Sequence, residues 1–235
     1  MRNIRRYILA FMLVSPLMAM AQQERMDSCR ALVSVKTNLL LDAAYIPQYG
    51  MAPIWNIAME YYPSHGHYTW GLSFDSPWAK RSSEHKYFMA RNYQIEVRRY
   101  FQGDGEFKGW YVQGYAHAVK YGIGFNADKG WQGEGFGGGL GAGYVTPLSR
   151  KGRWKLEFQL QLGYLWTKYD KYVYGCPVEG NDDGKYYYDW SLDASLFKKR
   201  QYRYTWIGPT RVGVTLSYDL IHRSAKKKKG GKQHG

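Results

Sequence analysis

The chain has 235 residues, 45% of them hydrophobic, which excludes a disordered protein, and its 23 tyrosines and 27 glycines are typical of an all-β chain rather than a helical one. The formal net charge is +14. Most of that excess lies in Arg2, Arg5 and Arg6 and in the lysine-rich segment 222–235, so it does not indicate a basic face on the fold.

The N-terminal residues 1–21 have the features of a cleaved signal peptide. Three arginines precede an apolar run that is too short to span a membrane as a helix, and the sequence A-M-A ends at Ala21. The alternative is an uncleaved N-terminal anchor. No later stretch reaches about 18 consecutive apolar residues. We therefore expect an exported chain with a short periplasmic lead at 22–32 and no nucleic-acid partner.

Eight segments alternate apolar and polar residues with the period of a β-strand. They are 33–43, 55–61, 68–78, 93–98, 110–125, 136–145, 154–166 and 212–220. The clearest is WKLEFQLQLGYLW at 154–166, whose apolar face begins and ends in tryptophan. A membrane-spanning strand needs ~9–11 residues with aromatic residues at both interfaces, whereas strands of soluble proteins usually have ~5–6. The pattern therefore favours transmembrane strands.

The connections between these segments alternate in length. The long ones are 44–54, 79–87, 126–135 and 174–206, and the short ones are 63–67, 102–109 and 149–153. Strict alternation predicts an antiparallel up-and-down barrel with short periplasmic turns and long outer loops. We expect an all-β, eight-stranded transmembrane β-barrel over residues 33–221, with both termini periplasmic in an outer membrane.

An eight-stranded soluble barrel or jelly roll has the same periodicity with its apolar face turned inward. Three features favour the membrane: the length of the strands, their Trp and Tyr borders, and a polar face made almost wholly of glycine at Gly137, Gly139, Gly141 and Gly143. Glycines that face a narrow lumen leave room for long side chains opposite.

Polar residues on the inward face of the barrel form the candidate site. In a barrel of this size side chains fill the interior, and an unpaired buried charge is costly. We therefore expect a packed polar network of Lys36, Asn38, Asp42, Glu60, Asp75, Gln94, Glu96, Arg98, Lys155, Glu157, Arg211 and Asp219. A narrow pore is the alternative for this lumen.

A lipid-modifying enzyme is a second alternative, because small barrels can carry hydrolases and acyltransferases. Ser73, His117 and Glu96 are inward candidates for a nucleophile, a base and an acid, but they lie on separate strands. His222 and Ser224 lie close together in the tail. The six histidines have no metal-ligand spacing, and we expect neither a metal nor a cofactor.

The connection 174–206 is the candidate binding segment, because it combines acidic, aromatic and basic stretches. It either contacts a surface protein or glycan or folds as a lid on the rim, and Asp182 with Asp183 is a weak calcium candidate. Cys29 precedes the first strand and Cys176 opens this connection, so the topology places them a membrane thickness apart and unpaired with each other. Residues 222–235 are expected to be a disordered basic tail or to contact anionic envelope polymers or lipid headgroups.

Four segments carry a family resemblance: VKTNLLLDAAYIP (35–47), YQIEVRRYF (93–101), GFGGGLGAGYV (135–145) and WIGPTRVGVTLSY (206–218). They resemble small outer-membrane barrels of Bacteroidetes that are catalogued only as a domain of unknown function. The resemblance implies an outer-membrane barrel, with some members near fimbrial genes, and no known activity. Arg211, Gly213, Leu216 and Tyr218 resemble the assembly signal that the barrel-assembly machinery reads.

The function expected from these features is structural or a surface interaction of the cell envelope, such as adhesion. The expected partners are outer-membrane lipid and lipopolysaccharide, the barrel-assembly machinery, and a surface protein or glycan.

Overall fold

The computed structural model describes residues 33–46, 49–63, 66–102, 107–126, 129–148, 153–172 and 200–221. Eight long or medium strands dominate it: β1 (Val33–Asn38), β4 (Ile54–Tyr61), β5 (Tyr68–Arg81), β6 (Lys86–Tyr100), β7 (Gly109–Asn126), β8 (Lys129–Pro147), β9 (Trp154–Tyr172) and β10 (Tyr202–Ile221). A helical turn, α2 (Leu39–Asp42), two short strands, β2 (Tyr45–Ile46) and β3 (Gly50–Met51), and the turn η2 (Ser82–Glu84) complete it.

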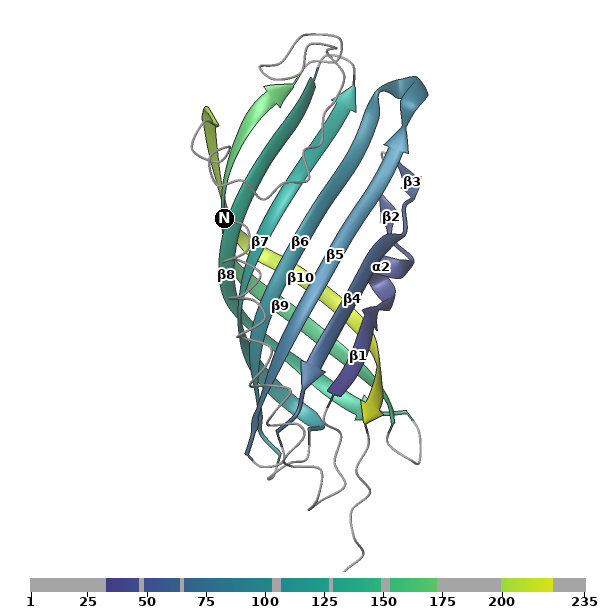
Figure 1. Cartoon of the computed structure of the whole chain (residues 1–235), viewed down its shortest axis with the longest axis vertical. Coiled ribbons are helices and arrows are strands. Elements are labelled where there is room, and N and C mark those ends of the chain that lie inside the picture. Colours follow the sequence, from purple (N-terminus) through teal and green to yellow (C-terminus); the bar gives the residue numbers. More distant parts are fainter. Residues whose placement is uncertain are drawn as a thin grey trace, which may run out of the picture.

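The eight strands form one closed barrel in the order β1-β10-β9-β8-β7-β6-β5-β4 (Figure 1). Every neighbouring pair is antiparallel, and β1 closes the ring by pairing with both β10 and β4. Each strand after β4 therefore lies beside its sequence neighbour, as in a meander. The prediction of an all-β, up-and-down fold with eight antiparallel strands is confirmed.

The side chains that point into the barrel are polar and buried, and those that point outward are apolar and exposed. Along β1, Ser34, Lys36 and Asn38 are at most 5% exposed, whereas Val33 and Val35 are only half-buried. On the outside, Trp55 is 81% exposed and Leu140 is 74% exposed. The soluble alternative requires the apolar side chains to point inward, and this arrangement is the reverse.

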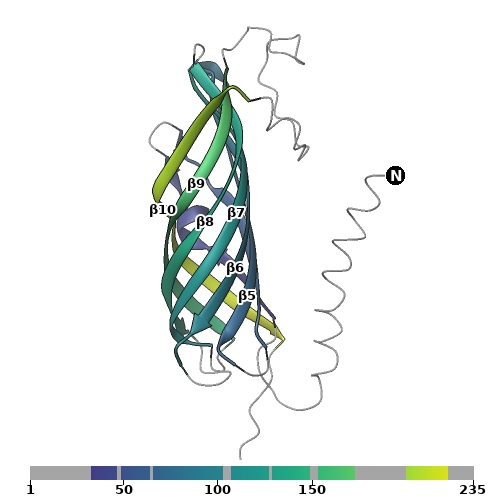
Figure 2. The same cartoon turned by 90° about the vertical axis from the view of Figure 1, so that its left-hand side faces the viewer.

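The prediction of long loops at 79–87 and 126–135 is wrong. β5 continues to Arg81 and β6 begins at Lys86, so most of 79–87 is strand, and β7 and β8 likewise extend through most of 126–135. The reason is that antiparallel backbone pairing continues after the apolar alternation has ended. The strands β5 to β10 have 14 to 20 residues each, well beyond the ~9–11 that cross a membrane. Figure 2 shows these hairpins rising as one tall sheet.

The first and last strands also differ from expectation. The segment 33–43 is strand only as far as Asn38, because the Asn38 side chain caps α2 by accepting a hydrogen bond from the Leu40 backbone N–H at 3.2 Å. The last strand begins at Tyr202 rather than at residue 212. The expected connection 44–54 contains the short hairpin of β2 and β3.

The ring is complete only at the end where the chain turns from β4 to β5, from β6 to β7 and from β8 to β9, here called the turn end. There β1 pairs with β10 between residues 215 and 221. Towards the opposite end, here called the open end, the described residues pair β10 from 202 to 214 with β9 alone. Figure 1 shows α2, β2 and β3 beside this part of the barrel.

The segment after β1 packs against the barrel wall at the open end. Asn38 Nδ2 donates to the Val212 carbonyl oxygen at 3.3 Å, across the interrupted β1–β10 pairing. Tyr49 and Ala52 form a small apolar cluster with Ala79, and Phe88 packs against it. Within the described residues, no helix is long and apolar enough to cross a membrane.

Candidate functional site

The barrel interior holds most of the residues predicted to face inward. Nine are at most 8% exposed: Lys36, Asn38, Glu60, Asp75, Gln94, Glu96, Arg98, Glu157 and Asp219. The side chains of Lys155 and Arg211 are 12% and 11% exposed. The placement of Asp42 in the lumen is wrong. Asp42 is exposed on α2, where it accepts hydrogen bonds from Thr37 and Asn56, because the strand alternation ends at Asn38.

Two bases and two acids from four strands meet near the turn end. Lys36 Nζ contacts Glu60 Oε2 and lies 2.7 Å from Glu157 Oε2. Arg98 Nη1 lies 3.2 Å from Glu60 Oε2 and 2.9 Å from Glu157 Oε2. Each base thus bridges both acids, which compensates the large desolvation cost of burying them.

The remaining oxygens of this network also have partners. Arg98 Nη2 lies 2.6 Å from Glu96 Oε1, and Gln94 donates to Glu96 Oε2 at 3.0 Å. The Tyr111 hydroxyl donates to Glu157 Oε1 at 2.6 Å, and the Tyr62 hydroxyl donates to Glu60 Oε2 at 3.0 Å. Hydrogen bonds to charged acceptors are stronger than those between neutral groups, so these contacts both satisfy the carboxylate oxygens and stabilise the network.

An aromatic floor closes the barrel below the network. This aromatic floor consists of four aromatic residues and one valine, all at most 7% exposed: Tyr62, Tyr100, Phe107, Tyr111 and Val145. The Tyr62 and Phe107 rings lie 5.0 Å apart, and the Tyr100 and Tyr111 rings 5.2 Å apart. Sequence reasoning did not include these tyrosines in the site. The available signal was the alternation, which places Tyr100 and Tyr111 on the same face as Arg98 and Gln113.

A second polar cluster lies above the network, towards the open end. Arg211 contacts Asp75 and donates to the Ser73 hydroxyl at 3.0 Å. Asn92 donates to Asp75 Oδ2 at 3.0 Å, and its own amide oxygen lies 3.1 Å from His117 Nδ1. Outside both clusters, Lys155 Nζ lies 3.0 Å from Asp219 Oδ2 near the β1–β10 junction.

The cavity between the two clusters is small. It has a volume of about 20 Å³ and is lined by Glu96, Arg98, Asp75, Arg211, Gln159 and Thr215, among others. One water molecule needs roughly 10–15 Å³. The space therefore holds a water molecule or so, not a column of ions or a substrate.

Inward glycines on β8 let neighbouring side chains cross the lumen. A Cβ on Gly143 would overlap the Tyr111 hydroxyl, and one on Gly141 would lie 2.7 Å from Gln113 Nε2. A Cβ on Gly137 would lie 2.8 Å from His117 Nε2. The prediction that these glycines make room for long side chains is confirmed.

Three inward glutamines differ from the rest of the interior. Gln113, Gln159 and Gln161 are at most 7% exposed. Both side-chain polar atoms of Gln113 and of Gln161, and Oε1 of Gln159, have no hydrogen-bond partner among the described residues. Buried polar groups are nearly always hydrogen-bonded, so this layer is the least satisfied part of the lumen.

The residues considered for catalysis do not form a triad. Ser73 accepts from Arg211, His117 faces Asn92, and Glu96 is bound by Arg98 and Gln94. No hydrogen bond joins these three residues in the described part of the chain. The same part contains no cluster of three metal-ligating side chains.

Arg200 leads a polar cluster at the open end. Its guanidinium donates to both Glu134 oxygens, at 3.0 and 2.8 Å, and to Asp170 Oδ2 at 2.9 Å. Burial alone lowers the pKa of Arg200, but the hydrogen bonds to Glu134 and Asp170 raise it above its ordinary value. This arginine is therefore charged at every accessible pH and holds the start of β10 against β8 and β9.

The residues proposed as the assembly signal lie on both faces of β10. Gly213 is buried and faces inward like Arg211, whereas Leu216 and Tyr218 are half-buried on the outer face. Other predictions fall outside the described residues: the signal peptide, the lead 22–32, Cys29 and Cys176, Asp182 and Asp183, the tail with His222 and Ser224, and residues 174–199 of the candidate binding segment 174–206.

Fold and interior together define a class: an all-β up-and-down sheet of eight strands that closes on a filled, charged interior. The chain belongs to the family described as "Protein of unknown function (DUF3575)", whose sequence model matches residues 8–220. Neither a curated protein nor a solved structure matches the chain.

Proposed function

We propose that this protein is an exported outer-membrane β-barrel whose lumen is sealed and whose role is structural or a surface interaction. The observation that carries the proposal is the inverted burial: charged side chains inside and large apolar side chains outside. In water, so continuous an apolar surface would be an aggregation liability, whereas lipid is its natural solvent.

The apolar surface has the height and borders that a membrane requires. Along β9 the outward residues Leu156, Phe158, Leu160, Leu162 and Tyr164 lie between Trp154 and Trp166. Those nine residues, 156 to 164, match the ~9–11 of a tilted transmembrane strand. Aromatic pairs such as Trp110 with Tyr144 and Phe136 with Trp166 border the same band on neighbouring strands.

The strand register supports one orientation. The short turns lie at one end, and the tall hairpins and the connection after β9 lie at the other. Outer-membrane barrels have short periplasmic turns, so we assign the turn end to the periplasm and the open end to the cell surface. Both ends of the described chain, at Val33 and Ile221, then lie on the periplasmic side.

The filled interior favours a role outside the lumen. The buried charges are paired, the aromatic floor lies below them, and the cavity between the clusters is about 20 Å³. Contact with other molecules is therefore assigned to the open end and to the connection between β9 and β10, residues 173–201, which is rich in Tyr, Lys and Arg and contains Trp190.

The surface role is tested by shortening the connection after β9. Residues 178–196 are replaced by a short Gly-Ser linker, which keeps Arg200 and its contacts, and binding to cells and to isolated envelope components is compared with the full chain. Reduced binding with unchanged heat-modifiable gel migration supports the role. Unchanged binding sinks it. Planar-bilayer conductance of the full chain, expected to be absent, separates the pore alternative.

A further inference from the structure

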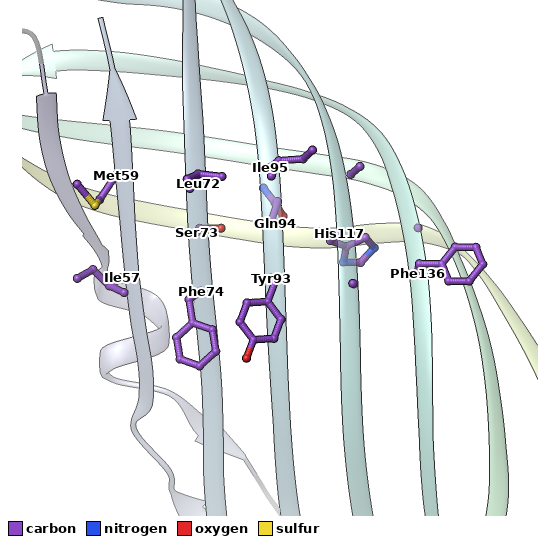
Figure 3. A pocket seen from close by; sticks show the side chains of 13 residues that line it. Ile57, Met59, Leu72, Ser73, Phe74, Tyr93, Gln94, Ile95, His117 and Phe136 are labelled. Atoms are coloured by element: carbon purple, nitrogen blue, oxygen red, sulfur yellow. The ribbon is translucent and has the colours of Figure 1, made fainter. Parts of the chain in front are cut away.

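A hydrophobic groove lies on the outer face of the barrel. Its volume is about 700 Å³, and its walls include Leu72, Phe74, Tyr93, Ile95 and Phe136 (Figure 3). Phe74 and Tyr93 form one wall, with ring centroids 5.0 Å apart. The groove is on the apolar outside, not in the lumen, because its wall residues are the outward members of β5, β6 and β8.

Small residues on β7 produce the hollow. The outward positions in the middle of this strand are Gly114, Ala116 and Ala118, and the register places Gly138 of β8 opposite Ala116. On β9 the positions in register with these three carry Leu162, Tyr164 and Trp166 instead. The surface is therefore recessed over β7 and full over β9.

A row of basic residues borders the groove on its open-end side. Arg91 pairs with Lys120, Lys120 with Glu134, Glu134 with Lys168, and Lys168 with Arg203, on five successive strands. Arg91, Glu134 and Lys168 lie two residues nearer the open end than Tyr93, Phe136 and Trp166 on the same strands, so the row lies on the same outer face. Lys120 Nζ lies 3.9 Å from Glu134 Oε1.

Among the described residues, this region carries more positive than negative charge. Five bases, Arg91, Lys120, Lys168, Arg200 and Arg203, lie there with two acids, Glu134 and Asp170; Arg200 binds both carboxylates, and Lys120 also lies within 4 Å of Glu134. The side chains of Arg91 and Lys168 are half-buried, and Arg203 is exposed. In the proposed orientation, this row lies at the level of the headgroups of the outer leaflet.

We propose that the groove and the basic row together bind one phosphorylated lipid of the outer leaflet, with an acyl chain over Ala116 and Ala118 of β7 and a phosphate at Arg91 on the adjacent strand β6. The inference rests on the proposed insertion in the membrane. Charge complementarity selects this occupant, because arginine and lysine bind phosphate with charge-assisted hydrogen bonds. A second copy of the chain is disfavoured as the occupant, because a two-fold axis at the groove would bring two basic rows together.

The groove is tested with lipid A as the probe. The full chain is delipidated in detergent, and binding of bis-phosphorylated lipid A is followed by native mass spectrometry. Filling the groove with Ala118→Leu or Ala118→Phe weakens binding at least tenfold. The matched control Val212→Phe, on the outer face of β10, leaves it unchanged. Heat-modifiable migration checks that each variant is folded, and Ala118→Leu is the conservative choice if Ala118→Phe is not.

The basic row is tested by removing charge from either partner. Arg91→Gln, or dephosphorylation of lipid A, weakens binding about tenfold, whereas Arg99→Gln at the turn-end border of the same strand has no effect. Inorganic phosphate does not compete, since the acyl chain is required. Equal binding by the groove variants and the wild type overturns the inference, as does a wild-type dimer that Ala118→Leu dissociates. A chain that is absent from the outer membrane refutes the proposed function instead.

Discussion

Lys36 and Glu157 are 121 residues apart in the sequence, yet Lys36 Nζ donates to Glu157 Oε2 at 2.7 Å in the barrel interior. Both side chains are at most 3% exposed. The pair joins β1, the first strand, to β9, which are separated in the ring by β10. The two side chains therefore meet inside the lumen over β10, and not between hydrogen-bonded neighbouring strands.

Glu157→Gln should destabilise the barrel strongly. The substitution removes the acceptor charge shared by Lys36 and Arg98 and leaves two buried cations with Glu60 and Glu96 alone. Breaking a buried ion pair from one side costs about 3–5 kcal/mol. The midpoint of heat-modifiable unfolding should fall accordingly. The control Glu84→Gln removes an exposed carboxylate at the open end, whose pairs with Arg81 and Lys86 are screened by solvent, and should lower the midpoint far less. Equal midpoints for both variants would disprove the role of the network.

Gly139→Ala and Gly114→Ala should behave oppositely. A Cβ on Gly139 would overlap the Leu162 carbonyl oxygen of the neighbouring strand, so the backbone itself must shift, at a cost of about 1–3 kcal/mol. A Cβ on Gly114 meets nothing within 4 Å. Urea unfolding of the two variants in the same lipid checks this. A destabilised Gly114→Ala or a neutral Gly139→Ala contradicts the packing described for β8.

Gln161→Leu should be neutral or stabilising, although it replaces a polar residue inside a polar lumen. The Gln161 amide has no partner among the described residues, and an unsatisfied buried polar group costs about 1–3 kcal/mol. Gln94→Leu serves as the comparison, because Gln94 donates to Glu96 and its loss should lower stability. If Gln161→Leu is as destabilising as Gln94→Leu, the amide is bonded in the native protein.

Asn38→Ala should loosen the interrupted side of the barrel. The side chain caps α2 and donates to the Val212 carbonyl, and loss of a helix cap costs about 1 kcal/mol. Amide hydrogen exchange should speed up in 39–46 and around Val212, with no change near Tyr111 at the turn end. Thr205→Ala, on an exposed part of β10, is the control. Unchanged exchange in 39–46 would show that Asn38 does not hold this segment.

The Glu84 carboxyl should titrate below its usual range. Its pKa is lowered first by the hydrogen bond from Lys86 Nζ, 2.6 Å away, and further by the charge of Arg81. Because the folded pKa lies below the unfolded value of 4.5, the contribution to the hairpin is present above pH 4.5 and is lost as pH falls through the folded pKa. Carbon-13 NMR of labelled glutamates measures it. Lys86→Gln should raise the pKa, and no rise would assign the shift elsewhere.

Much of the interior was predictable because strand parity alone decides which face a residue takes. Glu60, Arg98 and Glu157 could be assigned to one face from their positions in alternating segments. Their pairing could not, because it depends on the register between strands far apart in sequence. Asp42 was misplaced since the capping role of Asn38 is a local hydrogen bond that alternation does not reveal.

The length of the strands was underestimated for a related reason. From Tyr93 and Phe136 towards the open end, the outward positions become charged, with Arg91, Lys120 and Glu134. The apolar pattern therefore ends there, although the backbone pairing continues. The aromatic floor was missed because Tyr62 and Phe107 lie in or beside the short turns, outside the alternating segments.

The central claim, a barrel with a charged interior and a lipid-facing exterior, is tested most directly by sucrose-gradient fractionation of cells combined with protease treatment from outside. The account predicts that the chain sediments with outer membranes, requires detergent for release, and is cut only in the connection after β9, leaving a protected fragment that migrates differently before and after heating. Recovery of the chain in the soluble periplasmic fraction without detergent would contradict it.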